Sequence, residues 1–204
     1  MPDLSRYKGI VFDMDGTLID SMGSHSTAWQ QTCQQYGYPY DGDYIHNLGG
    51  VPTREIVKLL NEKYGRNHDL DEVTETKRQA FLDLDENPTV IEETFSVMQR
   101  YQGILKMGVG TGSERGNAIR MLTETGLLDR VETVVTATDV TYGKPHGETF
   151  LTVAKNMGLK PEECVVFEDT EIGRQAAQNA GMDCIMVVYG KIVLPIARRE
   201  KMGD

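Results

Sequence analysis

The chain repeats one local design five times, and this repetition limits the possible folds more than any other feature. Each copy is a short, mostly apolar run that stops at a polar or small residue, and the copies lie at 9–12, 105–109, 133–137, 164–167 and 184–188. Apolar runs of this length are typical of strands that are buried on both faces, as in a parallel sheet. We therefore predict five strands at these positions.

Helical patterns follow three of these runs, at residues 114–125, 148–157 and 171–179. Each is closed by a glycine, the residue that most readily takes the left-handed conformation at a helix end. Strands that alternate with helices of this length predict an α/β fold with a doubly wound parallel sheet. In such folds the polar residues after the strands meet along the carboxyl edge of the sheet, where ligands bind.

The pattern changes between residues 21 and 100, where strand-like runs are missing. Helical patterns at 24–36, 53–64 and 70–84 take their place, separated by segments that contain Gly, Pro and Asn. We predict a small all-helical cap of residues 21–100, inserted after the first strand of a core made of residues 1–20 and 101–204. The end of that core, residues 191–204, is expected to be a partly frayed basic segment.

Composition narrows the range of partners. The net charge is -10 and no basic stripe offsets it, so we expect no nucleic-acid partner. No apolar run approaches the roughly 18 residues of a membrane helix, and the polar start lacks a secretory signal, so we expect a cytoplasmic protein without a membrane partner. The three cysteines are widely spaced and odd in number, which favours reduced structural thiols. A monomer or a weak homo-oligomer is expected.

Acidic residues follow two of the predicted strands. Asp13 and Asp15 come directly after the first run, and Glu168 and Asp169 close the fourth. A D-x-D pair alone is most often a polar turn, but parallel strands would bring all four carboxylates into one crevice, where they repel one another unless a cation is bound. Mg²⁺ prefers such oxygen ligands, and Asp13, Asp169 and the main-chain carbonyl of Asp15 match its needs.

Two further segments supply what a phosphoryl group needs. Thr111, in the run from Gly110 to Ser113, offers a hydroxyl beside backbone N–H groups such as that of Gly112, just before a predicted helix. Lys144 offers a point charge beside the stiff Pro145. Each would be an ordinary loop residue by itself. Together with the carboxylates they form the parts of a phosphoryl-transfer site: a nucleophile, a metal site and donors for the phosphoryl oxygens.

Four motifs now stand in a fixed order along the chain: Asp13-Met-Asp-Gly-Thr17, Thr111, Lys144-Pro145 and Glu168-Asp169. They resemble the four motifs of the haloacid dehalogenase superfamily. The order of the motifs and the position of the cap are similar to those of its β-phosphoglucomutase-like and fructose-1-phosphate-phosphatase-like branch. The resemblance covers residues 8–190.

The resemblance implies roles for these residues. Asp13 would be the nucleophile on phosphorus, and Asp15 the general acid and then the general base. Thr111, Gly112 and Lys144 would bind the phosphoryl group. Asp13, Asp15 and Asp169 would hold Mg²⁺, and Glu168 would be a further ligand or would orient the site.

The resemblance also implies the activity, a magnesium-dependent phosphatase for a small phosphorylated metabolite. The cap would choose the substrate, and His25 and Arg54 resemble the residues with which sugar-phosphate members of the family hold theirs. A sugar phosphate such as fructose 1-phosphate or a hexose 6-phosphate is therefore expected. Trp29 is interpreted as cap packing. The remaining histidines are interpreted as solvated loop residues: His46, His68 and His146.

Two alternatives stay open. A phosphomutase would use the same aspartyl-phosphate but return the phosphoryl group to a sugar. Mutases of this branch carry Lys-Asn where this chain has Glu114-Arg115, and Glu114 would repel a second phosphate. A phospho-receiver, which is a binding switch rather than an enzyme, also combines aspartates, a Thr and a Lys-Pro, but it has no reason to carry a helical cap.

Overall fold

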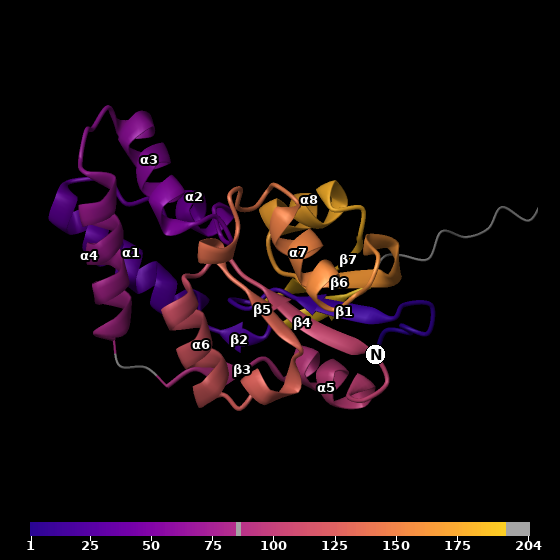
Figure 1. Ribbon diagram of the computed structural model, residues 1–204. Coiled ribbons are helices and arrows are strands. Elements are labelled where there is room, and N and C mark those ends of the chain that lie inside the picture. The colour runs from indigo at the N-terminus through magenta and orange to yellow at the C-terminus, as the bar shows by residue number, and fades with distance from the viewer. Residues whose placement is uncertain (85–86, 195–204) are drawn as a thin grey trace, which may run out of the picture.

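The computed structural model describes residues 1–84 and 87–194, which form a sheet covered by helices and a helical lobe beside it (Figure 1). Within these residues the main sheet has six strands in the order β5-β4-β1-β6-β7-β8. Their bounds are β1 Gly9–Phe12, β4 Lys106–Gly110, β5 Thr133–Val135, β6 Cys164–Glu168, β7 Asp183–Val188 and β8 Lys191–Val193. All but β8 are parallel, which confirms the predicted doubly wound α/β sheet.

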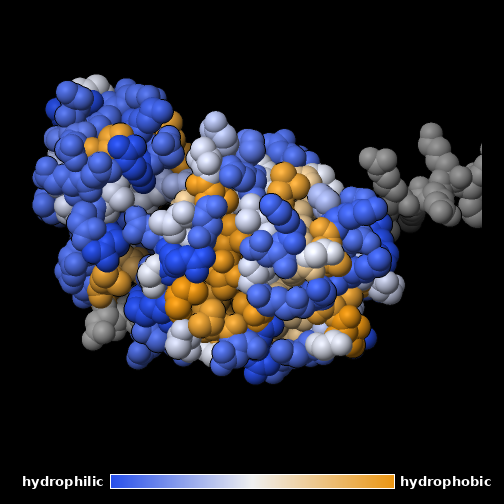
Figure 2. All heavy atoms as spheres, viewed as in Figure 1, coloured by the Kyte–Doolittle hydropathy of each residue, from blue (hydrophilic) through white to orange (hydrophobic). Residues whose placement is uncertain are grey.

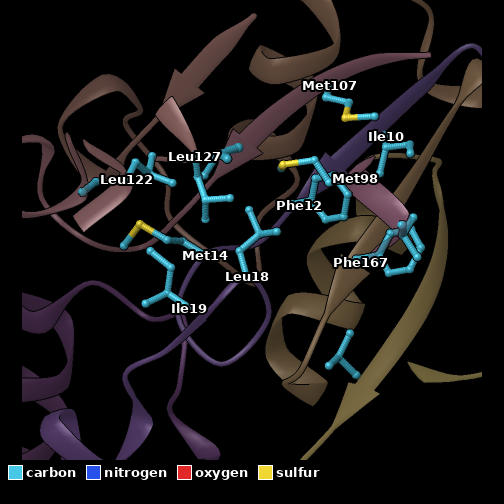
Figure 3. Close-up of a cluster of buried hydrophobic side chains, with 14 of the residues drawn as sticks. Ile10, Phe12, Met14, Leu18, Ile19, Met98, Met107, Leu122, Leu127 and Phe167 are labelled. Atoms are coloured by element: carbon cyan, nitrogen blue, oxygen red, sulfur yellow. The ribbon is translucent and has the colours of Figure 1, made fainter. Parts of the chain in front are cut away.

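Helices cover both faces of this sheet, because successive residues of a strand point to opposite sides. Ile10 and Phe12 of β1 pack in a cluster with α5 (Glu92–Tyr101) and α6 (Arg115–Glu124), which Figure 3 shows in close-up. Val11 packs on the other side with α7 (Glu148–Asn156) and α8 (Glu171–Asn179). Burial on both faces explains why the strands are continuously apolar in the sequence.

The helical lobe is the predicted cap. Its helices are α1 Met22–Tyr36, α2 Gly42–Asn47, α3 Thr53–Tyr64 and α4 Leu70–Leu82. The lobe has a core of its own, in which Trp29 and Cys33 of α1 pack with Leu60 of α3 and Val73 of α4. Its outer face is mostly hydrophilic in the view of Figure 2. The sequence did not predict α2, a helix too short to show a period.

The boundaries of the cap remain a proposal. A small antiparallel pair, β2 (Ile19–Asp20) and β3 (Thr89–Val90), joins the lobe to the sheet. The next helix, α5, contributes Met98 to the cluster of the main sheet, where it lies beside Phe12 (Figure 3). Because α5 packs with the core, we propose that the cap ends before β3 rather than at residue 100.

Two connections differ from the expected ends. The run 133–137 stops as a strand at Val135, because Ala137–Asp139 forms a 3-10 helix; the other short 3-10 helices are Leu128–Arg130 and Pro161–Glu163. At the carboxyl end, β8 is a paired strand where a frayed segment was expected, while residues 195–204 lie outside the described residues.

Among the described helices, none combines the length and apolar character needed to cross a bilayer.

Candidate active site

The residues predicted to bind the phosphoryl group meet at the carboxyl edge of the sheet. Phe12 of β1 is in register with Val109 of β4 and with Phe167 of β6. The residues that follow these three positions therefore lie side by side at the carboxyl edge of the sheet. Lys144, from the loop between β5 and α7, enters the same place, where its ammonium group is buried. Its Nζ lies 2.6 Å from Asp13 Oδ1 and 2.8 Å from Glu168 Oε2.

These ion pairs keep Lys144 charged. Burial alone would lower the pKa of the Lys144 ammonium, but the carboxylates of Asp13 and Glu168 outweigh it and raise the pKa above its ordinary value. A buried lysine that remains a cation is suited to hold phosphoryl oxygens. The structure therefore supplies the positive charge that the sequence predicted at this position.

Glu168 is held by hydrogen bonds on both of its carboxylate oxygens. It is fully buried, and its Oε1 accepts hydrogen bonds from the backbone N–H of Asp169 at 3.1 Å and from the N–H and hydroxyl of Thr170 at 3.0 and 2.8 Å. A Cβ on Gly173 would lie 1.9 Å from Glu168 Cδ, so this helix position has no room for a side chain. Glu168 thus anchors Lys144 in the loop.

Three carboxylates form a cluster with the chemistry of a metal site. Oxygen atoms of Asp13, Glu168 and Asp169 lie within 4.8 Å of one another. Burial and the neighbouring carboxylates raise the pKa of Asp13 and of Asp169. Raised values of this origin mean that the cluster carries more negative charge than Lys144 neutralises. An all-oxygen donor set with excess negative charge fits a hard divalent cation such as Mg²⁺.

The turn after β1 brings Asp169 into this cluster. Gly16 has a φ of 83°, and a Cβ at this position would lie 2.2 Å from Asp169 Oδ2. The hydroxyl of Thr17 donates to Asp169 Oδ1 at 3.3 Å. The glycine and threonine of the first motif therefore serve to seat the aspartate of the last.

The side chain of Asp15 faces away from the cluster. Its Oδ1 accepts from the hydroxyl of Ser21 at 2.7 Å and lies 3.2 Å from His25 Nε2, and its Oδ2 accepts from the hydroxyl of Ser113 at 2.7 Å. Thr111 Oγ1 lies 3.4 Å from the same Oδ2. The Asp15 carboxylate is not part of the acidic cluster, so a metal-binding role for this residue would rest on its main-chain carbonyl.

These contacts set the acidity of Asp15. Burial alone would raise the pKa of Asp15, but its interaction with His25 and its hydrogen bonds from the hydroxyls of Ser21 and Ser113 lower it below its ordinary value. Asp13 and Asp15 thus stand two residues apart with pKa values shifted in opposite directions. Such a division is typical of paired carboxylates with different catalytic tasks.

A residue that sequence reasoning missed lies behind His25. Lys77 of α4 is 5% exposed, and its Nζ lies 2.7 Å from His25 Nδ1. Because an ammonium can only donate, Nδ1 accepts and the proton of the neutral ring sits on Nε2, from which it is donated to Asp15. One signal could have revealed Lys77: it lies between Val73 and Phe81 at spacing of four, on the buried face of its helix.

The pH dependence of stability and activity tests this role of Lys77. Burial lowers the pKa of Lys77 from 10.5 to about 8, so above pH 8 the folded chain loses a proton that the unfolded chain keeps until about pH 10.5. Stability therefore rises with pH in this window, by up to about 3 kcal/mol relative to Lys77→Met. Turnover of Lys77→Met should fall by about tenfold or more, because His25 loses its orienting donor.

Urea unfolding at pH 7, 9 and 10 measures the first effect, and initial rates measure the second. Lys58→Met, which removes an exposed lysine from the same lobe, is the matched control. Equal turnover and parallel pH profiles for Lys77→Met and the wild type would show that Lys77 only packs the cap.

The cap and the core enclose a cavity of about 100 Å³ over these groups. Core residues form its floor and cap residues its roof: Asp13, Asp15, Thr111, Gly112 and Ser113 below, and His25, Ser26, Trp29, His46, Thr53 and Lys77 above. The cap touches the core closely, since a Cβ on Gly112 would lie 2.2 Å from the carbonyl oxygen of Gly50. Gly112, a predicted phosphate-binding residue, is therefore also a point of close contact between the core and the cap.

Some predicted residues lie elsewhere. Arg54 does not line this cavity, and its Nε pairs with Asp71 at 2.7 Å on the exposed surface of the cap. His68 is not simply solvated, because its ring packs edge-on against Tyr36 and Tyr38 inside the cap. Trp29 does pack in the cap as expected, and it also faces the cavity.

The fold and the site together define a class of phosphoryl-transfer enzymes, and comparison with known proteins identifies the class. The sequence profile described as haloacid dehalogenase-like hydrolase matches residues 10–187. The fructose-1-phosphate phosphatase YqaB of Escherichia coli is 39% identical over 188 residues, which is 89% of this chain and 97% of the relative. The chain belongs to the haloacid dehalogenase-like hydrolases, and within them it is a phosphatase.

Two further comparisons agree with the family. The β-phosphoglucomutase of Bacillus subtilis is 28% identical over 92% of this chain and 86% of its own length. A solved structure of a hydrolase from Pseudomonas syringae superposes with a TM-score of 0.81 at 25% identity, covering 90% of this chain and 85% of that one. The phospho-receiver alternative has no support from these relatives.

Proposed function

We propose that the chain is a magnesium-dependent phosphatase that removes phosphate from a small phosphorylated sugar through an aspartyl-phosphate on Asp13. The observation that carries this proposal is the pair of aspartates in one cavity. Asp13 faces Lys144 and the acidic cluster, while Asp15 faces hydroxyl groups and the His25 ring of the cap. This difference supports a role for Asp13 in attack on phosphorus and a role for Asp15 in proton transfer.

In the first half-reaction a carboxylate oxygen of Asp13 attacks the phosphorus atom, and the bond from phosphorus to the sugar oxygen breaks. Lys144, the Thr111 hydroxyl and the backbone N–H of Gly112 would hold the other phosphoryl oxygens. Asp15 donates a proton to the leaving oxygen. Asp15 is ionised without substrate, but the arrival of a phosphate dianion beside it raises its pKa and favours the protonated form.

In the second half-reaction Asp15 accepts a proton from water, whose oxygen attacks the phosphorus of the aspartyl-phosphate. The bond to Asp13 breaks, and inorganic phosphate leaves. The hydrogen bond from His25 Nε2 holds the Asp15 carboxylate toward the cavity, and Lys77 fixes the tautomer that makes this bond. A bound Mg²⁺ would supply positive charge to the phosphoryl oxygens.

Asp13, Asp169 and the carbonyl oxygen of Asp15 are the proposed magnesium ligands, with Glu168 holding Lys144 next to them. Mg²⁺ should then stabilise the fold, because it neutralises a buried cluster of negative charge. At a concentration of about 100 times its dissociation constant the expected gain is about 2.7 kcal/mol in the free energy of unfolding. Asp169→Asn should remove this gain, whereas Asp129→Asn, on the far surface, should keep it.

Thermal unfolding with and without Mg²⁺ measures the gain, and activity in excess chelator provides the second readout. Full turnover in chelator would rule out the proposed role of the metal.

The proposed substrate is a monophosphorylated sugar such as fructose 1-phosphate or a hexose 6-phosphate. The roof of the cavity offers the hydroxyls of Ser26 and Thr53 and the ring of His46, groups that can bond to sugar hydroxyls. Burial lowers the pKa of Lys77, and Glu114 is close enough to oppose that shift, so the charge of Glu114 would also oppose a second phosphate at the Lys77 side of the cavity. The relative YqaB, a fructose-1-phosphate phosphatase, supports the same class of substrate.

A phosphomutase is the second candidate, favoured by the similarity to β-phosphoglucomutase and by the closely fitted cap, which limits the access of water. Incubation of β-glucose 1-phosphate with a trace of glucose 1,6-bisphosphate separates the two, with a panel of sugar monophosphates in parallel. We expect phosphate release and free sugar. Rapid formation of glucose 6-phosphate without phosphate release would make the chain a mutase.

A further inference from the structure

The acidic cluster lies between two separate cavities. The first is the substrate cavity already described, which reaches Asp13 but not Asp169. The second cavity has a volume of about 410 Å³ and reaches Asp169 but not Asp13. It lies between the segments that join the cap to the core and the turn that joins β7 to β8, and its walls include Gly16, Asp20, Ile91, Asp169, Val188 and Tyr189. Met22 and His46 line both cavities and so form the partition between them.

The cap lies close against the core at the loops around the substrate cavity. Where the loop 48–52 meets the core, a Cβ on Gly49 would lie 2.8 Å from Thr170 Cγ2, and a Cβ on Gly143 would lie 2.6 Å from Pro52 Cγ. Gly50 and Gly112 fit together equally closely. With the cap in this position it lies in close contact with these core loops, and the second cavity opens to solvent on a different side.

The charges around the second cavity select for a cation. Two carboxylates line it, those of Asp20 and Asp169. The other titratable side chains among its described lining residues are His46 and Tyr189, and none of these residues is a lysine or an arginine. A cavity of this sign attracts a hydrated divalent cation and repels phosphate. Asp169 is also the one member of the cluster that is not fully buried, so it is the member that an ion can reach from here.

The outer rim of the second cavity is a tight turn with an exposed tyrosine. Tyr189 is 95% exposed and has a φ of 50°, and Gly190 has a φ of 72°. These angles form the tight two-residue turn of a β-hairpin, in which an aromatic residue at the first position is strained. The register of Val188 with Lys191 fixes the turn to the sheet. The rim is therefore joined to the sheet through the strand pair β7 and β8.

We infer that the second cavity is the route by which hydrated Mg²⁺ reaches and leaves Asp169 while the cap is closed over the substrate cavity. The inference rests on the proposed magnesium-dependent function. Val188 forms part of the wall of this route, and the carboxylate of Asp20 attracts the cation into it. Neither residue belongs to the proposed ligand set.

Metal-exchange kinetics test the route. Mn²⁺ is the probe, and a fluorescent chelator in a stopped-flow instrument reports its release from the protein and, in competition, its uptake. Val188→Trp should narrow the route, because a larger side chain then stands in its wall. Val193→Trp is the control, since Val193 is similarly exposed on the same hairpin but does not line the cavity. A narrowed route should slow uptake and release by the same factor, about tenfold, and leave the dissociation constant unchanged.

Asp20→Asn should slow uptake by about threefold at low ionic strength and leave release unchanged, and the difference should vanish at high salt. Unchanged rates in Val188→Trp, or equal slowing in Val193→Trp, would overturn the route. A weaker dissociation constant in Val188→Trp with unchanged uptake would overturn it as well, because it would indicate a distorted site. If wild-type protein binds no Mn²⁺ at all, the proposed function fails before the route is tested by its variants.

Discussion

Asp13→Asn is expected to lose turnover by about 10⁴-fold or more on every phosphate ester, because the proposed nucleophile is removed and Asp15, the other carboxylate of the cavity, is bound to the hydroxyls of Ser21 and Ser113. Acid-quenched protein should then contain no phosphoryl group, whereas the wild type should show one that is labile at high pH. The substitution should not lower the free energy of unfolding. The pKa of Asp13 is raised by burial and by Glu168, so its ionised form opposes folding at neutral pH, and the amide removes that cost.

Unfolding in chelator measures this second effect, and Asp13→Asn should be at least as stable as the wild type there. Asp71→Asn, an exposed aspartate of the cap, controls for loss of negative charge in general. Retained turnover, or a phosphoryl group still bound after the substitution, would move the nucleophile away from Asp13.

Asp15→Asn is expected to separate the two half-reactions. Alkyl phosphates such as sugar phosphates need a proton on the leaving oxygen, so their turnover should fall by about 10³-fold. An aryl phosphate has a leaving group that departs without a proton, so the first half-reaction should survive. The second half-reaction still lacks its base. The product should therefore appear as a burst equal to the enzyme concentration, followed by a slow phase.

Rapid mixing with an aryl phosphate measures the burst, and the same reaction with a sugar phosphate should show none. Ser113→Ala, which removes only one hydrogen bond to Asp15, should reduce turnover slightly without a burst. Equal losses on aryl and alkyl substrates, with no burst, would contradict the acid and base roles of Asp15.

Local patterns in the sequence predicted what depends on local structure. The helix Thr53–Tyr64 has the predicted bounds, and the strand ends carry Asp13, Thr111 and Glu168 to one edge, because apolar runs and helix-ending glycines act over a few residues. Parallel strands then fix the rest, since register places all carboxyl ends together. The shape of the core and the positions of its motifs were therefore accessible from the sequence.

Contacts between distant segments were not accessible. Lys77 contacts His25, which lies 52 positions away in the sequence, and no local pattern around either residue predicts this contact. Arg54 was predicted at the cavity because it resembles a substrate-binding residue of the family, but it pairs with Asp71 of α4, the next helix of the same lobe. Met98 looked like cap by position and packs with Phe12. In each case long-range packing decided the outcome, and a linear pattern does not contain it.

Trp29 gives the protein a built-in optical reporter. It is the single tryptophan of the chain, and it is 3% exposed at the roof of the substrate cavity, with Lys77 Nζ 5.6 Å from its ring. The emission of an indole depends on the polarity and charge around it. One signal per molecule therefore follows both the filling of the cavity and the lifting of the cap, without a label and without interference from a second indole. Ligand titrations and cap motion can be watched in the unmodified chain.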